Sequence, residues 1–411
     1  MDEAMNGAKR VARCPGGVRT PPPSKSLGHR AVICAALAAR GLAAGESVLQ
    51  NVGRSEDIDA TLAGVAALWS PAVAARGDVL RIGPGSAQTG LPRRVDCGES
   101  GSTLRFLLPL AALEARETVF TGRGRLLARP LAVYADLFRL SGAVFVQEPR
   151  AVRVRGPLRG GAYALPGDVS SQFVSGLLLT LPLLPDDSEI RLTTPLQSRG
   201  YVDLTLDVMR RFGVTVTQER ESYRIRGGQR YRPAVYQVEA DYSQAAFFLA
   251  AAALGRPVAV AGLNPESRQG DRAILEILRA MGAETDWRAG VVCVRAERLR
   301  AVTVDARETP DIVPPIAALC CFGEGRSRIV GAARLRLKES DRLHALAAEL
   351  GKLGARVEET EDTLTIEGAP RLAGGRVDAW NDHRIAMALA VAALRCDGPV
   401  LLTGWRSVAK S

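Results

Sequence analysis

The chain repeats one arrangement six times, in which a short polar loop stands directly before a helix rich in alanine and leucine. The loops recur at intervals of about seventy residues, which marks a supersecondary unit copied along the chain. Because the repeat runs through the whole sequence, it constrains the fold more than any other feature. The six loops begin near Ser24, Glu99, Ser170, Asp241, Asp311 and Asn381.

Within each repeat the pattern predicts a first helix, one or two strands, a second helix, a glycine and a further strand. A glycine directly after a helix is the usual left-handed stop. Four of the second helices have one: Gly142, Gly213, Gly282 and Gly354. We therefore predict an α/β (α+β) fold of six βαβαββ repeats, three per domain. The second helices are expected at residues 57–69, 131–140, 202–212, 272–281 and 341–353.

The length of 411 residues exceeds what one hydrophobic core usually supports, so two domains are expected. The repeat places an N-terminal domain at residues 20–239. The other domain consists of residues 240–411 together with residues 1–19, an N-terminal strand that crosses over. The sixth repeat stops at Ser411 before a second helix.

Composition narrows the class of partner. Hydrophobic residues make up 47% of the chain, but no apolar run reaches the roughly 18 residues that span a bilayer. The N-terminus does not resemble a secretory signal, and the seven cysteines form no CxxC pair, so we expect a cytoplasmic protein without a metal site. The net charge of +10 is dispersed over many arginines, which favours small anionic substrates over nucleic acid.

The first loop brings a lysine to the start of a helix. Ser24 or Ser26 is suited to cap the helix, and Lys25 then lies beside exposed backbone N–H groups. A cation is unfavourable there unless an anion binds as well. Arg30 falls on the same helix face as Ser26. An ordinary cap with solvated charges is the alternative.

The second and third loops are rich in small and hydroxyl residues at helix starts. Residues 97–105 combine two glycines and three hydroxyls, which suits a nest of backbone donors for an anion, although they lack the P-loop pattern. Ser170, Ser171 and Gln172 open the next helix. A simple small-residue turn is the alternative.

A charged cluster precedes the second helix of the fifth repeat. The alternation in residues 334–337 predicts a strand with one polar face, and Ser340 or Asp341 is expected to cap the helix that follows. Three helix N-termini per domain would then aim at one face, and arginine forks would bind carboxylate or phosphate there. The residues alone therefore predict an enzyme cleft for small polyanions.

Five segments together resemble the 3-phosphoshikimate 1-carboxyvinyltransferases, also called 5-enolpyruvylshikimate-3-phosphate synthases. The similarity runs in order from about residue 18 to residue 410. It implies a two-domain, inside-out α/β barrel-like fold, which agrees with the repeat. The segments are Ser24-Lys25-Ser26-x-x-His29-Arg30, Gly101-x-x-x-Arg105, Ser170-Ser171-Gln172-Phe173, Lys338-Glu339-Ser340-Asp341-Arg342 and Asn381-Asp382-His383-Arg384.

The resemblance implies enolpyruvyl transfer from phosphoenolpyruvate to the 5-hydroxyl of shikimate 3-phosphate, without metal or organic cofactor, by a monomer. It assigns proton transfer to Lys25, Asp311 and Glu339. The residues implied for shikimate 3-phosphate are Lys25, Ser26, Arg30, Ser170, Ser171, Gln172, Ser198, Asp311 and Lys338. Those implied for phosphoenolpyruvate are Lys25, Gly101, Arg129, Gln172, Arg342, Arg384 and Lys410.

Some positions depart from the family pattern. Pro23 replaces a common glycine, Glu99 replaces a common asparagine, and Arg334 stands where some members use asparagine toward shikimate 3-phosphate. The family's C-terminal helix and aromatic tail do not follow Ser411, so we expect Lys410 to be frayed and phosphoenolpyruvate binding or stability to be weakened. Gly101 hints at glyphosate sensitivity.

Two alternatives remain open at this point. The sister family of UDP-N-acetylglucosamine 1-carboxyvinyltransferases would share the fold, but it should show an early Lys-Asn pair and a mobile cysteine loop. Here Lys25 is followed by Ser26. A non-catalytic anion-binding relative is expected to lose Lys25, Asp311 or Glu339, and all three are present.

Overall fold

The computed structural model describes residues 7–12, 16–40, 45–86 and 93–410. The chain divides into two compact units, which we call lobes. The N-lobe is Pro23–Glu239, and the C-lobe combines Met1–Pro22 with Ala240–Ser411. Ser411 and Cys14 lie outside the described residues.

The second and third repeats, both in the N-lobe, follow the predicted βαβαββ order. In each, the first two strands are parallel and the closing hairpin is antiparallel, with sheet orders β6-β7-β9-β8 and β10-β11-β13-β12. The second repeat consists of β6 (Arg93–Asp96), α3 (Gly101–Ala111), β7 (Thr118–Thr121), α4 (Ala132–Leu140), β8 (Val144–Glu148) and β9 (Ala151–Arg155). The third consists of β10 (Gly161–Leu165), α5 (Ser171–Thr180), β11 (Ser188–Leu192), α6 (Arg199–Arg211), β12 (Thr217–Gln218) and β13 (Ser222–Ile225).

The first repeat takes its opening strand from the far end of the lobe. β14 (Val235–Gln237) pairs in parallel with β3, which gives the sheet order β14-β3-β5-β4. A strand that is distant in sequence therefore completes the same pattern. The other elements of this repeat are α1 (Lys25–Ala39), β3 (Ser47–Gln50), α2 (Glu56–Trp69), β4 (Ala72–Arg76) and β5 (Val79–Gly83).

The first repeat of the C-lobe is likewise completed by a strand that is distant in sequence. β2 (Gly17–Arg19) pairs in parallel with β15 and completes the sheet β16-β17-β15-β2 of the fourth repeat. The other elements of that repeat are α7 (Tyr242–Ala253), β15 (Val258–Ala261), η3 (Gly270–Ala273), α8 (Ile274–Ala280), β16 (Glu284–Arg288) and β17 (Val291–Arg295). A short pair, β18 (Leu299–Arg300) and β20 (Gly323–Glu324), lies nearby in sequence.

The fifth repeat forms the sheet β19-β21-β23-β22. Its elements are β19 (Thr303–Asp305), α9 (Val313–Cys320), β21 (Arg326–Val330), α10 (Arg342–Lys352), β22 (Arg356–Glu359) and β23 (Leu364–Glu367).

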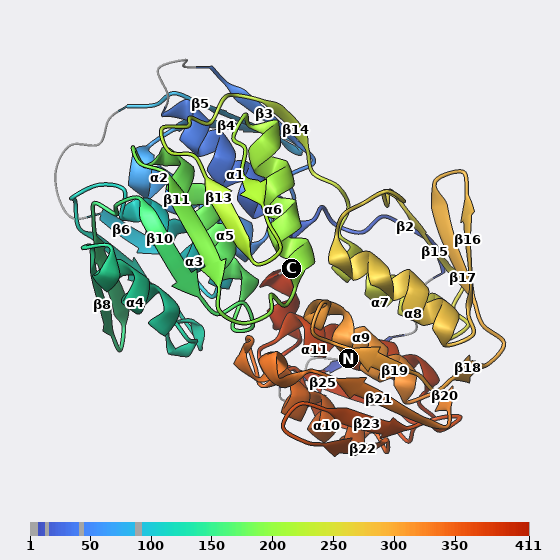
Figure 1. The fold of residues 1–411 in the computed structure, drawn as a ribbon. Coiled ribbons are helices and arrows are strands. Elements are labelled where there is room, and N and C mark those ends of the chain that lie inside the picture. The colour runs from blue at the N-terminus through green and yellow to red at the C-terminus, as the bar shows by residue number, and fades with distance from the viewer. Residues whose placement is uncertain (1–6, 13–15, 41–44, 87–92, 411) are drawn as a thin grey trace. The chain divides into compact units, whose positions relative to one another are not determined.

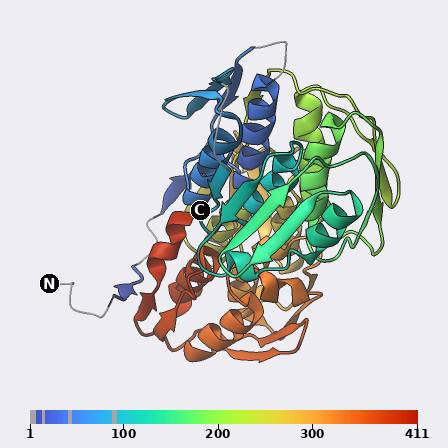
Figure 2. The ribbon, with the colours of Figure 1, turned by 90° about the vertical axis from the view of Figure 1, so that its left-hand side faces the viewer.

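The sixth repeat is shorter, with the sheet order β1-β25-β24. The N-terminal strand β1 (Lys9–Arg10) forms the edge of this sheet, beside the red C-terminal strands in Figure 2. The other elements are β24 (Gly375–Asp378), α11 (His383–Ala392), β25 (Val400–Thr403) and η7 (Trp405–Lys410).

In each lobe, the first helix of every repeat lies inside and the sheets lie outside (Figure 1). Every residue of α1 from Leu27 to Ala38 is buried, and all but His29 and Arg30 are small or apolar, as expected for an inner helix. Small residues allow close packing, since a side chain at Gly176 of α5 would collide with the backbone of α3. Burial of each large apolar side chain contributes roughly 1.5–3 kcal/mol, so these helices hold their lobe together.

Most local predictions are confirmed. Gly142, Gly213, Gly282 and Gly354 have φ values of 79°, 80°, 91° and 97°, in the left-handed region expected of helix stops. The five second helices are present, although α6 begins at Arg199 rather than at residue 202. No helix among the described residues is long and apolar enough to cross a membrane.

The predicted strand at residues 334–337 is wrong. These residues form a 3-10 helix, η5 (Ala333–Leu337), in which Leu335 is fully buried and Leu337 is 45% exposed. Turn hydrogen bonds close the segment, from Leu335 N to the carbonyl of Ala332 at 2.9 Å and from Lys338 N to that of Leu335. The side chain of Arg336 stabilises the turn by donating to the carbonyls of Thr360 and Glu361.

Candidate active site

The helix α1 begins at Lys25, as predicted. Ser24 takes the cap position with an extended backbone but makes no side-chain cap hydrogen bond. Lys25 Nζ instead lies 2.8 Å from Asp57 Oδ2, in the first turn of α2. The carboxylate offsets the unfavourable placement of a cation at the positive end of a helix.

Arg30 lies one turn further along α1 and is only 2% exposed. Its guanidinium donates to the carbonyl of Ser26 at 2.6 Å, to Thr205 Oγ1 at 2.7 Å and to the carbonyl of Tyr201 at 2.8 Å. Burial lowers the pKa of Arg30 to about 10, which still leaves the side chain charged at neutral pH. Arg30 thus joins the starts of α1 and α6 by a buried positive charge.

Two guanidinium groups and an amide meet around Gly101, the first residue of α3. A methyl group at this position would lie 2.9 Å from Nη1 of both Arg105 and Arg129, and 3.5 Å from Gln172 Oε1. Arg105 Nη1 donates to Gln172 Oε1 at 2.9 Å, and Gln172 Nε2 donates to Ser102 Oγ at 2.9 Å. The structure therefore brings together the predicted residues Gly101, Arg129 and Gln172.

The predicted serines stand at the starts of the next two helices. Ser170 caps α5 by accepting from Gln172 N at 3.3 Å, and Ser171 begins that helix. Ser198 precedes α6 in the left-handed region, with φ of 57°, and is buried. These serines and Gln172 lie at helix N-termini, where hydroxyl and backbone donors suit a phosphate.

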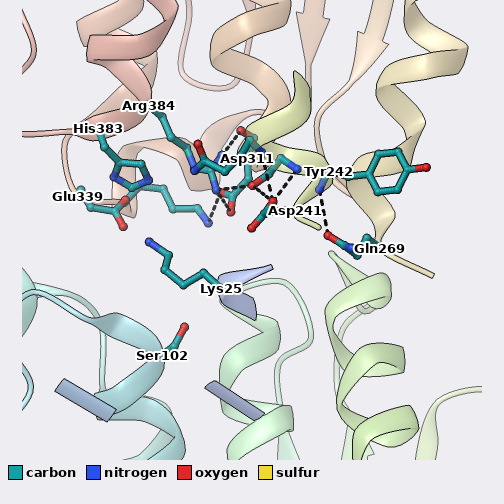
Figure 3. A network of polar contacts seen from close by, with 12 residues as sticks. Lys25, Ser102, Asp241, Tyr242, Gln269, Asp311, Glu339, His383 and Arg384 are labelled. Atoms are coloured by element: carbon teal, nitrogen blue, oxygen red, sulfur yellow. Dashed lines mark hydrogen bonds and ion pairs between the residues drawn. The ribbon is translucent and has the colours of Figure 1, made fainter. Parts of the chain in front are cut away.

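In the C-lobe, Asp311 is the centre of a network of cations (Figure 3). Its carboxylate lies 3.1 Å from Arg342 Nη1, 3.1 Å from Arg384 Nη2 and 3.4 Å from Lys338 Nζ. Arg384 Nη1 also donates to the Asp311 carbonyl at 2.9 Å. Burial acts to raise the pKa of Asp311, but Arg384, Lys338 and Arg342 hold it well below its usual range.

Arg342 connects this network to two further carboxylates. It is 1% exposed and lies 2.7 Å from Glu339 Oε2 and 2.8 Å from Asp382 Oδ2. Burial acts to lower the pKa of Arg342, but Asp382, Glu339 and Asp311 outweigh it and raise that pKa. The predicted residues Asp311, Glu339, Arg342 and Arg384 thus form one network.

Lys338 differs from the arginines because it can lose its proton. Burial lowers the pKa of Lys338, and Asp311 only partly offsets this effect.

The expectation that Lys410 is frayed is wrong. Its side chain is 6% exposed, and its ammonium donates to the carbonyl of Asn381 at 2.7 Å. The short helix η7, which contains Lys410, packs against α11 and orders the segment. Tertiary contacts within the C-lobe therefore hold Lys410 in place.

Sequence reasoning left four residues of these networks without a role. Asp382 is fully buried, caps α11 and accepts from Arg342. Asp57 and Arg105 contact predicted residues, and Ser243 Oγ accepts from Arg384 Nη2 at 3.0 Å. Asp382 and Arg105 stood inside the quoted motifs, but Asp57 and Ser243 gave no comparable signal.

Each lobe therefore has clustered cations at the starts of its inner helices, and the C-lobe adds carboxylates held by those cations. These features define an enzyme that binds small anionic substrates and moves protons and groups between them. Among the described residues, no group of three or more histidine, cysteine, aspartate or glutamate side chains is placed to hold a metal ion.

Comparison with known proteins identifies the class more closely. The family model for EPSP synthase (3-phosphoshikimate 1-carboxyvinyltransferase) matches residues 9–411. A 3-phosphoshikimate 1-carboxyvinyltransferase of Clostridium acetobutylicum is 43% identical over 99% of this chain and 95% of the relative. One of Clostridium kluyveri is 44% identical over 95% and 91%.

Solved structures agree. An EPSP synthase of Acinetobacter baumannii superimposes with a TM-score of 0.77 at 27% identity, covering 98% of this chain and 95% of the other. An enolpyruvyl transferase of Streptomyces tendae has the same TM-score at 17% identity, with coverage of 98% and 94%, and supports the fold alone. The predicted two-domain α/β fold is confirmed.

The chain belongs to the EPSP synthase family. It is a transferase of the shikimate pathway, which leads to the aromatic amino acids, and its substrates are small molecules.

Proposed function

We propose that the predicted site residues carry out enolpyruvyl transfer from phosphoenolpyruvate to the 5-hydroxyl of shikimate 3-phosphate. The network of Asp311 with Arg342, Arg384 and Lys338 is the observation that carries this proposal. It combines a carboxylate that can accept a proton with guanidinium groups that can bind the carboxylate or phosphate of a substrate. Family membership supports the choice of substrates.

Shikimate 3-phosphate is proposed to bind largely through the N-lobe helix starts, where hydroxyls and a buried guanidinium gather. Its residues are Lys25, Ser26, Arg30, Ser170, Ser171, Gln172, Ser198, Asp311 and Lys338. Phosphoenolpyruvate is proposed to bind through groups that suit a carboxylate and a phosphate. Its residues are Lys25, Gly101, Arg129, Gln172, Arg342, Arg384 and Lys410.

The chemistry needs a proton delivered to one carbon and another removed from the hydroxyl. The 5-oxygen attacks C2 of phosphoenolpyruvate while Glu339 protonates C3, and Asp311 accepts the hydroxyl proton. Phosphate then leaves the tetrahedral adduct and the C3 proton is lost, which gives the enol ether. Lys25 contacts both substrates and assists these proton transfers.

Asp311 is a weak base while three cations surround it, because its pKa lies well below its usual range. Arg342 and Arg384 are also the proposed ligands of phosphoenolpyruvate. When the substrate carboxylate or phosphate attracts these arginines, the pKa of Asp311 should rise toward the range of an effective base. Binding of phosphoenolpyruvate would therefore activate the base.

Phosphate release from shikimate 3-phosphate and phosphoenolpyruvate tests the proposal. Lys25→Met and Glu339→Gln should each lower kcat about 100-fold or more, because each removes a proton-transfer group. Glu276→Gln, an exposed change on α8, is the control and should retain normal turnover. No release by the unaltered protein would refute the reaction, whereas normal turnover in both variants would refute the assigned roles.

We further propose a cytoplasmic monomer. The described cysteines are free thiols, which suits a reducing compartment. Light scattering on the purified protein tests the monomer, since a dimeric mass would contradict it.

The proposed domain boundaries are the ones predicted from the sequence repeat. One domain is residues 20–239, and the other combines residues 1–19 with residues 240–411. Inhibition by glyphosate, proposed because of Gly101, can be measured in the same phosphate assay.

A further inference from the structure

The turn between β24 and α11 has an unusual backbone. Trp380 and Asn381 have φ values of 53° and 52°, so two successive residues with side chains occupy the left-handed region. Side chains disfavour that region, and such strain persists only where the surroundings enforce it. Such strained residues also cluster at functional sites.

Glu349 of α10 is the main anchor of this turn. Its carboxylate is fully buried, although α10 also carries the exposed Lys352. Glu349 Oε1 accepts from the indole Nε1 of Trp380 at 2.7 Å, and Oε2 accepts from the backbone N of Asp378 at 3.0 Å. One carboxylate therefore fixes the strand end and the first strained residue together.

The turn in its fixed shape presents a backbone acceptor. The carbonyl of Asn381 accepts from Lys410 Nζ at 2.7 Å. Asp382 N donates to the carbonyl of Ala379 at 2.8 Å, which closes the turn just before α11 begins. The position of the Lys410 ammonium therefore depends on the conformation of the turn.

We propose that Glu349 is a positioning residue for phosphoenolpyruvate binding. Glu349 fixes the turn at Trp380 and Asn381, and the carbonyl of Asn381 then holds the ammonium group of Lys410. This inference rests on the proposed role of Lys410 as a ligand of phosphoenolpyruvate. Glu349 touches neither substrate, and its effect passes through hydrogen bonds within the C-lobe.

Three substitutions separate positioning from general stability. Trp380→Phe removes the indole donor, and Trp380 is 37% exposed, so the fold should tolerate the change. Glu349→Gln removes one acceptor and the charge. Lys352→Ala is the matched control, because Lys352 Nζ contacts the same carboxylate at 2.8 Å without touching the turn.

The experiment measures KM for each substrate, kcat and Tm. Trp380→Phe and Glu349→Gln should raise the KM for phosphoenolpyruvate about fivefold or more, as expected when a charged hydrogen bond loses its support. The KM for shikimate 3-phosphate should stay near that of the unaltered protein, and Lys352→Ala should leave both values unchanged. If Glu349→Gln does not fold, Trp380→Phe decides alone.

The outcomes distinguish this inference from the proposed function. No phosphate release by the unaltered protein would remove the proposed function itself. An active protein whose variants keep the KM for phosphoenolpyruvate would overturn the role of Glu349. Equal changes for both substrates, together with a lower Tm, would show a merely structural residue and would also overturn it.

Discussion

Buried charge is concentrated on a few side chains, each with several partners. Arg342 and Asp382 are 1% and 0% exposed, yet they lie 2.8 Å apart. Burying two ions costs several kcal/mol each, and a buried pair often stabilises no better than apolar residues would. The pair is therefore better explained by the need to hold a guanidinium at a chosen point than by stability.

His29 shows the opposite case of a buried group that stays neutral. It is 1% exposed, and its Nδ1 lies 2.7 Å from Thr61 Oγ1. Burial lowers the pKa of His29 to about 3. Between pH 6.5 and pH 3, His29 is therefore protonated in the unfolded chain but neutral in the folded chain.

The free energy of unfolding should thus fall as pH drops from 6.5 toward 3, by at most about 1.4 kcal/mol per pH unit from this group. Urea unfolding at several pH values measures the slope. His29→Gln should flatten it, whereas His344→Gln, at a site with a 51% exposed side chain, should not. Equal slopes in the unaltered protein and His29→Gln would contradict the prediction.

At the scale of elements, side-chain caps begin most of the helices that carry site residues. Ser100, Ser170, Asp241, Asp341 and Asp382 each accept from a backbone N–H of the helix that follows. α1 and α6 are exceptions, because Ser24 and Ser198 make no such bond. The first N–H groups of α1 are therefore not covered by a capping side chain, which suits the proposed anion site beside Lys25.

Asp341 offers a test of what a cap contributes. It accepts from His344 N at 3.0 Å and lies 2.9 Å from Arg336. Asp341→Ala should lower the free energy of unfolding by about 1 kcal/mol, seen as a fall in Tm of about 2–4 °C. Asp59→Ala, an acid in the first turn of α2 that does not cap it, should change Tm much less. An equal loss in both variants would show that charge, rather than the cap, is responsible.

At the scale of the whole molecule, distant strands complete the first repeat of each lobe. β14 joins β3 in the N-lobe, and β2 joins β15 in the C-lobe. β1 likewise forms the edge of the sheet that contains β25. Residues at the beginning of the chain are therefore part of the C-lobe's own sheets.

Removal of residues 1–19 should weaken the C-lobe selectively, because β15 and β25 would lose a neighbouring strand. Hydrogen exchange should rise at Val258–Ala261 and Val400–Thr403. The sheet β6-β7-β9-β8, which contains no residue from the removed segment, is the internal reference and should keep its protection. Unchanged exchange at β15 and β25 would contradict this view of the N-terminal strands.

The repeat, the helix starts and the glycine stops could all be predicted from the amino-acid sequence. Capping and left-handed glycines act within a few residues, so Asp341 and Gly213 could be interpreted without knowing the fold. The resemblance to a family added the reaction and the candidate residues. Its motifs are contiguous and can be matched one residue at a time.

Which of these residues contact one another depends on the three-dimensional fold. Asp311 contacts Arg384, 73 positions away, and β14 reaches β3 across the length of the N-lobe. Residues 334–337 alternate like a strand but form a turn, and Lys410 is ordered by its contact with Asn381. Such outcomes depend on which surfaces and carbonyls the folded chain places nearby, and local periodicity carries no information about that.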